Sequence, residues 1–284
     1  MKINYFSLSH IIYLLLATAF VLAFYFIFKN RSYRAQRIAV LSLVLINVFQ
    51  HLFKLEIYPI YDGGFNILCT AYNMCALLIL LSPLAFFIKL SPLRDFIYFI
   101  GTSAGVVALL VPYWNIGDDA LSGEFVRFFI CHIVLLASSI LPLLFGHHKA
   151  SWRRFALLGI SFFAAIGLIL LNDALMIKIG LYPGFSGENI LEGLKSANPI
   201  WSFSPPESFS FVIKIVDVFT PDFLMGDKSG KNLVPVLWYF IPLYLFISIA
   251  AFAIFALCDR ENFTRDFALI KAKIKGVFSK NKNA

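Results

Sequence analysis

Long apolar stretches, separated by short polar connections, run through most of the chain. A stretch of about 20 apolar residues is long enough to cross the hydrocarbon core of a bilayer as a helix. The pattern therefore predicts an all-α fold, a polytopic seven-helix transmembrane bundle within residues 1–258. The predicted spans are 8–28, 38–58, 65–89, 94–114, 124–145, 153–178 and 234–257.

The composition of the chain supports a membrane protein. Of the 284 residues, 60% are hydrophobic and 14% are charged, and a soluble domain cannot bury that much apolar surface. The formal net charge is +8, but the basic residues lie between and after the apolar stretches. They do not form the continuous basic surface that a nucleic acid requires, so we expect no nucleic-acid partner.

The positions of lysine and arginine predict the orientation of the bundle. Basic residues gather in the connections 29–37, 89–95 and 146–154 and after residue 258, while the alternate connections carry more acidic residues. Because basic connections stay on the cytoplasmic side, we expect an outside N-terminus and a cytoplasmic C-terminus. The first apolar stretch is too long for a cleavable signal. We expect a multi-pass protein of the plasma membrane.

Two segments outside the spans have features of their own. The outer loop, 179–233, is too long and too aromatic for a simple linker. Within it, Ser204-Pro205-Pro206-Glu207 has the form of a helix start, and the apolar run that follows is too short to span a membrane. We expect a short interfacial helix there. The tail, 259–284, has apolar residues at helical spacing among lysines, which predicts a basic amphipathic helix on the cytoplasmic membrane surface.

Small residues in the fourth predicted span indicate close helix packing. Gly101 and Gly105 are four residues apart and therefore lie on one face of a helix. This spacing lets a neighbouring helix approach closely. We expect a packing contact here.

Polar residues that fall within the spans lie mostly toward their predicted outer ends. At 1.5 Å per residue, they lie within roughly 5–15 Å of the outer interface, and few comparable groups occupy the inner half. Polar groups inside a membrane are costly unless they meet partners or water. We therefore expect a site in the outer leaflet. Its candidate residues are Cys75 and His132 as catalytic groups and His51, Tyr72, Asn73, Arg127, Asn172 and Asp173 as binding groups.

The most specific chemistry in this set is a cysteine–histidine pair. A thiol becomes a good nucleophile when a nearby imidazole takes its proton, and cysteine suits acyl transfer because thioesters form and break readily. Cys75 is the candidate nucleophile, and His132 is the candidate base. Arg127 could hold a phosphate or a carboxylate. On a continuous helix, Tyr72 would share a face with Cys75, whereas Asn73 would lie about 200° away.

Structural roles remain open for the same residues. A cysteine in a membrane helix often packs as a small apolar residue, and a buried histidine often satisfies a carbonyl or a hydroxyl. His51 fits that second role, and Asn172 and Asp173 could cap the sixth span. No set of residues has the spacing of metal ligands, so we expect no metal and no cofactor.

Several stretches resemble a known family in a consistent order over roughly residues 38–257. FIYFIGTSAGVVALLVP at 96–112 and EFVRFFICHIVLL at 124–136 resemble the YwaF family of bacterial integral membrane proteins, which is similar to the animal transmembrane protein 164 family. Asn172, Asn198-Pro199 and Trp238-Tyr239 also fit the family pattern. The family's third span begins with P-L-H-x-C, which aligns its cysteine with Cys75 and replaces its histidine by Asn73.

The resemblance implies a function. The animal relatives are described as acyltransferases that move fatty acyl groups between phospholipids through a cysteine. The resemblance implies that Cys75 would carry the acyl group and that His132 would be its base. It also implies that membrane phospholipids would be the partners. Tyr72 or Asn66 could then donate a hydrogen bond to the oxyanion.

We therefore expect a lipid acyltransferase-like membrane protein that works through a cysteine thioester in an outer-leaflet cavity. The alternative is a non-enzymatic binding protein or transporter for a small solute or a lipid, with Arg127 and Asp173 as contacts. A transporter should tolerate the substitution Cys75→Ser, whereas a thioester enzyme should not.

Overall fold

The computed structural model describes residues 2–57, 66–112, 115–184, 189–202, 218 and 240–280, and within them the regular structure is helical. The first part of the chain forms α1 (Leu8–Phe28), α2 (Tyr33–Leu52), α3 (Lys54–Ile57), η1 (Ile67–Cys69), α4 (Met74–Leu81), α5 (Leu84–Phe87), α6 (Ser91–Asp95), the π-helical η2 (Phe96–Ile100) and α7 (Gly101–Leu110). The second part forms α8 (Gly123–Leu144), η4 (Trp152–Arg154), α9 (Phe155–Lys178), α10 (Ile190–Ala197), η5 (Pro199–Trp201), α13 (Phe240–Cys258) and α14 (Arg260–Lys280).

Several helices are long and apolar enough to cross a membrane, which makes this a multi-pass membrane protein. Among the described residues there are five, namely Leu8–Phe28, Tyr33–Leu52, Ser91–Leu110, Gly123–Leu144 and Trp152–Lys178. Two shorter apolar helical segments, Met74–Phe87 and Tyr244–Cys258, fall within the third and seventh predicted spans. The seven-span count therefore stays a prediction, while the helical fold and most predicted spans agree with the structure.

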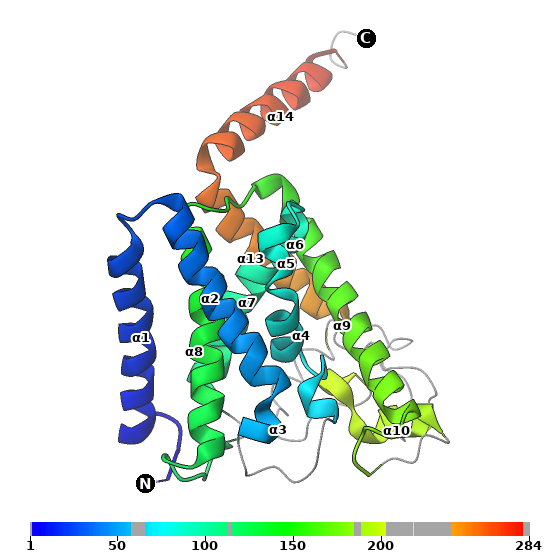
Figure 1. Ribbon diagram of the computed structural model, residues 1–284. Coiled ribbons are helices and arrows are strands. Elements are labelled where there is room, and N and C mark those ends of the chain that lie inside the picture. The colour runs from blue at the N-terminus through cyan, green and yellow to red at the C-terminus, as the bar shows by residue number, and fades with distance from the viewer. Residues whose placement is uncertain are drawn as a thin grey trace.

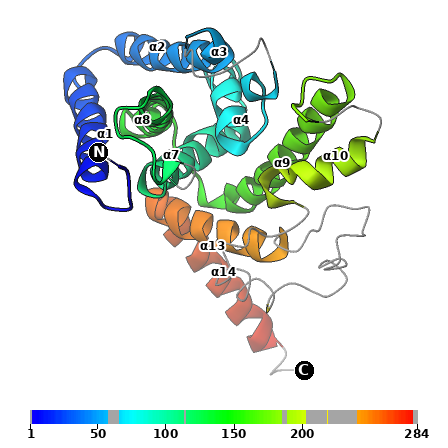
Figure 2. The same ribbon diagram turned by 90° about the horizontal axis from the view of Figure 1, so that it is seen from below.

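Helix α8 lies at the centre of the first half of the bundle, with α1, α2 and α7 around it (Figure 2). Its Phe125, Phe129 and Leu135 are fully buried. The contact between α7 and α8 is close because of the two glycines predicted to allow it. A Cβ atom on Gly105 would lie 2.9 Å from Cβ of Leu136, and one on Gly101 would collide with the Ser139 hydroxyl.

The bundle has two ends that differ in what they carry (Figure 1). The N-terminus, α3 and α10 lie at one end, which we call the N-terminal end. The opposite end, which we call the tail end, carries α14 and the connections α1–α2, α5–α6 and α8–α9. These connections are the basic ones, so the charge pattern correctly grouped them at one end. The first is shorter than the predicted 29–37, because α2 already begins at Tyr33.

The third predicted span, 65–89, is not a continuous helix. Residues 66–73 are irregular apart from the short η1, and α4 begins only at Met74. Asparagine side chains hydrogen-bond nearby backbone groups and so favour caps over helix interiors. Here the Asn66 side chain accepts the Leu68 N–H at 2.9 Å, and the Asn73 side chain accepts the Ala76 N–H at 2.8 Å. Tyr72 therefore precedes the helix, and the helical face it was predicted to share with Cys75 does not exist.

The segments outside the spans were predicted only in part. The short interfacial helix expected from Ser204 lies outside the described residues, and α10 in the same outer loop was not predicted. The tail forms α14, as its amphipathic pattern predicts. Near its start, Phe263 packs edge-on against Trp152 and Phe252, with ring centroids 5.5 and 5.7 Å apart.

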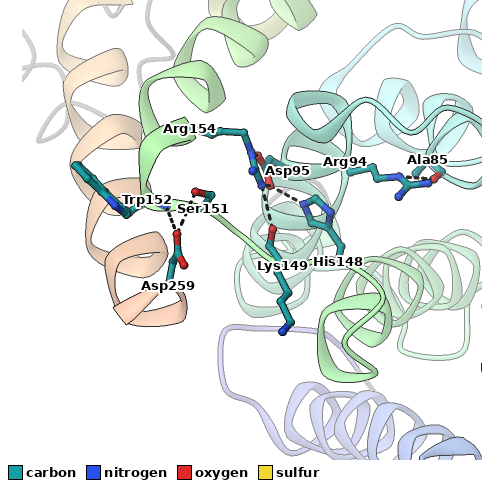
Figure 3. Close-up of polar contacts among 9 residues, drawn as sticks. All are labelled: Ala85, Arg94, Asp95, His148, Lys149, Ser151, Trp152, Arg154 and Asp259. Atoms are coloured by element: carbon teal, nitrogen blue, oxygen red, sulfur yellow. Dashed lines mark hydrogen bonds and ion pairs between the residues drawn. The ribbon is translucent and has the colours of Figure 1, made fainter. Parts of the chain in front are cut away.

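A group of charged residues is buried at the tail end (Figure 3). Asp95 accepts hydrogen bonds from Arg154 Nε at 2.7 Å and from His148 Nε2 at 2.6 Å, and we call these three residues the aspartate cluster. Beside it, Asp259 accepts the Ser151 hydroxyl at 3.0 Å. The expectation that few polar groups occupy the inner half of the spans was wrong. The sequence did not reveal this group, because only the fold brings its distant residues together.

Candidate functional site

The candidate site lies toward the N-terminal end of the bundle, where α2 ends and where α4 and α8 begin (Figures 1 and 2). Side chains from α3, the irregular segment 66–73, α4 and α8 approach one another there. We call the central group the thiol–cation cluster. It consists of Lys54, Tyr72, Cys75, Arg127 and Cys131.

Cys75 is the second residue of α4 and is partly buried. The first N–H groups of a helix have no partner within it. Asn73 satisfies the Ala76 N–H, but the N–H groups of Met74 and Cys75 have no acceptor among the described residues. The positive end of the helix and these open N–H groups favour an oxyanion at this position.

Lys54 is buried beside this helix start, with only 2% of its surface exposed. Its ammonium lies 5.0 Å from the centroid of the Tyr72 ring, which is a cation–π distance. In the described part of the chain no carboxylate comes within ion-pair distance of it. Tyr72, which is near Cys75, thus connects a buried positive charge to the thiol.

Arg127 brings a second positive charge to the cluster from α8. Its guanidinium forms an ion pair with Glu124, one turn earlier, with Nε 3.0 Å from Oε2. It is also close enough to Lys54 and Tyr72 for electrostatic interaction. Four residues later on the same helical face, Cys131 lies near Cys75. The cluster therefore combines two thiols with two cations.

His132 lies one residue beyond Cys131, so its side chain points about 100° further around α8. Its Nδ1 donates to the Phe128 carbonyl at 2.7 Å, and its ring packs on Phe128 at 4.3 Å between centroids. This hydrogen bond leaves Nε2 with a lone pair that can accept a proton. His132 and Cys75 lie at a similar depth along the bundle, but no hydrogen bond joins them. The predicted pair is therefore not assembled.

The other predicted site residues hold the irregular segment 66–73 in place. His51 Nε2 donates to the Thr70 carbonyl at 3.0 Å. Asn172 donates to the Thr70 hydroxyl at 2.9 Å and to the neighbouring Asp173 carboxylate at 3.1 Å. These bonds join α2 and α9 to the segment that precedes Cys75. Beyond the end of α9, burial and then the Asp173 carboxylate raise the pKa of Tyr182.

Sequence reasoning missed two members of the thiol–cation cluster, Lys54 and Cys131. Lys54 had a usable signal, because it falls inside the predicted span 38–58, and a charge within a span marks a functional position. Cys131 had none, since a cysteine in an apolar helix resembles any small apolar residue. Asn73, predicted to bind, is the N-cap of α4.

The cysteines and acids of the site were also considered as metal ligands. All four cysteines of the chain are free thiols. Within residues 2–57, 66–112, 115–184, 189–202, 218 and 240–280, no three His, Cys, Asp or Glu side chains are grouped as a metal site requires. The chemistry we consider below is therefore that of the thiol and its neighbours.

Comparison with known proteins places the chain in a family. No curated protein and no solved structure matches it. The family model described as TMEM164 family matches residues 5–182, which is more than half of the chain. That range contains the whole thiol–cation cluster as well as His51, His132, Asn172 and Asp173. The chain therefore belongs to the TMEM164 family.

Proposed function

We propose that this membrane protein is a lipid acyltransferase in which Cys75 carries a fatty acyl group as a thioester. The observation that carries the proposal is the position of Cys75 in the first turn of α4, where two backbone N–H groups have no acceptor among the described residues. Tyr72 and Cys131 lie near Cys75 and are in turn near the two cations. Open N–H groups at a helix start can stabilise the oxyanion that forms when the sulfur attacks a carbonyl.

In the first half of the reaction, His132 Nε2 takes the proton of the Cys75 thiol. The thiolate attacks an ester carbonyl of a phospholipid, the carbon–oxygen ester bond breaks and the lysophospholipid leaves with the proton from His132. The Cys75 side chain must turn toward His132 for this step, because no hydrogen bond joins them in the structure. The bond from Nδ1 to Phe128 supports the assignment, since it leaves Nε2 free to accept the proton.

In the second half, a hydroxyl of an acceptor lipid attacks the thioester. His132 removes the hydroxyl proton, the new ester forms and the Cys75 thiolate leaves and regains a proton. No water or cofactor is consumed, so the exchange is balanced.

Backbone groups are better oxyanion donors here than the side chains considered from the sequence. The N–H groups of Met74 and Cys75 are adjacent to the sulfur and open, as an oxyanion site requires. The Asn66 side chain already caps η1, and the Tyr72 ring faces Lys54. We therefore assign the N–H groups of Met74 and Cys75 as the oxyanion donors.

A second candidate function is non-enzymatic binding or transport of an anionic lipid or solute. The missing hydrogen bond between Cys75 and His132 favours it, because an assembled catalytic pair is usually within hydrogen-bond reach. Cys75→Ser separates the two candidates. Binding should tolerate that change, whereas acyl transfer through a thioester should be lost.

We also propose a plasma-membrane protein whose tail end faces the cytoplasm and whose site faces the outer leaflet. The grouping of the basic connections at the tail end supports this orientation. Cys258 is exposed at the end of α13 and serves as a reporter. A membrane-impermeant maleimide should label Cys258 in inverted vesicles and spare it in intact cells, and the opposite result would reverse the orientation.

The acyl-enzyme is tested by labelling purified protein with a phospholipid whose acyl chain carries an alkyne. We expect a label that hydroxylamine removes, that Cys75→Ala abolishes and that His132→Ala reduces at least tenfold. Cys258→Ala is the matched control, because it removes an exposed thiol outside the site, and it should label like the wild type. If wild-type protein takes up no label from several phospholipids in intact membranes, the thioester mechanism is wrong.

A further inference from the structure

Lys54 is a buried positive charge for which the described residues supply no counter-ion within ion-pair distance. Only 2% of its surface is exposed, and it belongs to α3, a single turn between α2 and the irregular segment. Glu124 influences it only at longer range, and the ion pair of Glu124 is with Arg127. The Tyr72 ring gives the ammonium a partial substitute for water but no counter-ion.

A second cation makes this placement more costly. Arg127 acts on Lys54 as a like charge, which disfavours two cations in one buried region. Together, Lys54, Arg127 and Glu124 carry a single net positive charge. A fold does not gain stability from such an arrangement unless an anion completes it.

The two cations suit a phosphate group. An arginine guanidinium offers several N–H donors in a planar fork that matches phosphate oxygens, and a lysine adds a compact point charge. One phosphodiester carries one negative charge, which neutralises the net charge of the three groups. Tyr72 and Cys131 lie between these cations and Cys75, so a phosphate bound to the cations would belong to the same cluster as the thiol.

We propose that Lys54 and Arg127 form a phosphate-binding site that holds the head group of a glycerophospholipid beside Cys75. Resting on the proposed function, this assigns Lys54 as a substrate-binding residue of that site. The phosphate anchors the lipid at the N-terminal end of the bundle, and its ester carbonyl lies toward the start of α4. A free phosphate ion has the same chemistry and is the other source that the experiment must distinguish.

The test measures binding of a fluorescent phospholipid to purified Cys75→Ala protein, in which acyl transfer is absent. In this background we expect Lys54→Met to weaken phospholipid affinity at least tenfold. Lys29→Met is the matched control, because Lys29 also lies over an aromatic ring, Phe26 at 4.7 Å, but is exposed far from the site. It should change the affinity less than twofold.

Competitors identify the ligand. A phospholipid of the same chain length should displace the probe, and the matching diacylglycerol, which lacks the phosphate, should compete at least tenfold less well. Displacement by millimolar inorganic phosphate would also support a phosphate site but would assign it to the soluble ion. Equal competition by phospholipid and diacylglycerol, or unchanged binding in Lys54→Met, would overturn the proposal.

The same measurements keep this inference separate from the proposed function. Lys54-dependent phospholipid binding without hydroxylamine-sensitive labelling of wild-type protein would support the phosphate site while rejecting the acyl-enzyme. Hydroxylamine-sensitive labelling that Lys54→Met leaves unchanged, with unchanged binding, would support the acyl-enzyme while rejecting the phosphate site.

Discussion

Asp95 at the tail end and Lys54 at the N-terminal end are buried to the same degree, with 1% and 2% of their surfaces exposed, but they have very different neighbours. Asp95 receives hydrogen bonds from two positively chargeable side chains, Arg154 and His148. Lys54 has an aromatic ring beside it and a second cation nearby. The charge of Asp95 is matched by the protein itself, whereas the part of the chain that the structure describes offers Lys54 no counter-ion.

This difference separates a structural charge from one kept for a ligand. Removing one partner of a buried ion pair leaves the other charge unpaired, which is strongly destabilising. Removing a buried charge that has no partner takes away a desolvation cost instead. Substitution of Asp95 should therefore lower the free energy of unfolding, whereas substitution of Lys54 should leave it unchanged or raise it. Phospholipid binding should be weakened more by substitution of Lys54 than by substitution of Asp95.

The largest effect on stability should come from Asp95→Asn. The substitution removes a buried carboxylate that both Arg154 and His148 use as a partner, and we expect a loss of about 3 kcal/mol in the free energy of unfolding. Denaturation of the purified protein in mixed micelles measures this loss. Glu261→Gln, at an exposed acid in the first turn of α14, is the control and should cost less than about 0.5 kcal/mol. A loss below about 1 kcal/mol for Asp95→Asn would mean that the aspartate cluster is not structural.

A smaller effect is expected from Asn73→Ala. The change removes the N-cap of α4, which typically costs about 1 kcal/mol. Because the cap fixes the helix start next to Cys75, acylation of Cys75 should also slow severalfold. Asn73→Ser restores a capping oxygen and should recover most of both losses. If Asn73→Ser recovers stability but not acylation, Asn73 has a role at the site beyond capping.

Lys54→Met should change stability least among these substitutions. The apolar side chain replaces a buried ammonium that has no counter-ion, so we expect a change within about 1 kcal/mol, in the stabilising direction if any. The same denaturation experiment measures it. A loss of about 3 kcal/mol would show that Lys54, like Asp95, is paired by the protein, and the contrast between the two ends would no longer hold.

Acid should break the polar contact between the tail helix and η4. The hydrogen bonds from Arg153 hold the pKa of Asp266 below its usual value, so this contact is present above about pH 4 and is lost as the pH falls through the lowered pKa. Trp152 donates to the same carboxylate at 3.2 Å and reports the change through its fluorescence. Asp266→Asn should show the released signal already at neutral pH, whereas an unchanged signal in Asp266→Asn would place the contact elsewhere.

The predictable part of the fold was the part fixed by local pattern. Three predicted spans, 8–28, 124–145 and 153–178, agree closely with α1, α8 and η4–α9, because an unbroken apolar run determines where a membrane helix lies. The third span failed because two asparagine caps outweighed its apolar content.

For the candidate site, the sequence predicted only its depth along the helices of the bundle. Sequence positions placed Cys75, His132 and Arg127 toward the same end, and the structure agrees. Which of them touch was not predictable, since a difference of one residue on α8 decides whether Cys131 or His132 lies nearer to Cys75. The aspartate cluster shows the same limit, because Asp95 is more than 50 residues away in sequence from both His148 and Arg154.

The short connection between α8 and η4 has a consequence for the order in which the chain assembles during synthesis. His147 contacts Gln36 of α2 and His148 contacts Asp95 of α6, both of which are synthesised earlier. Ser151 contacts Asp259, which is synthesised about a hundred residues later. The ribosome therefore delivers these polar partners of α2 and α6 before α13 exists. Insertion can proceed in two stages, in which α13 and the tail join a framework whose polar connections between α2, α6 and the α8–η4 connection are already formed.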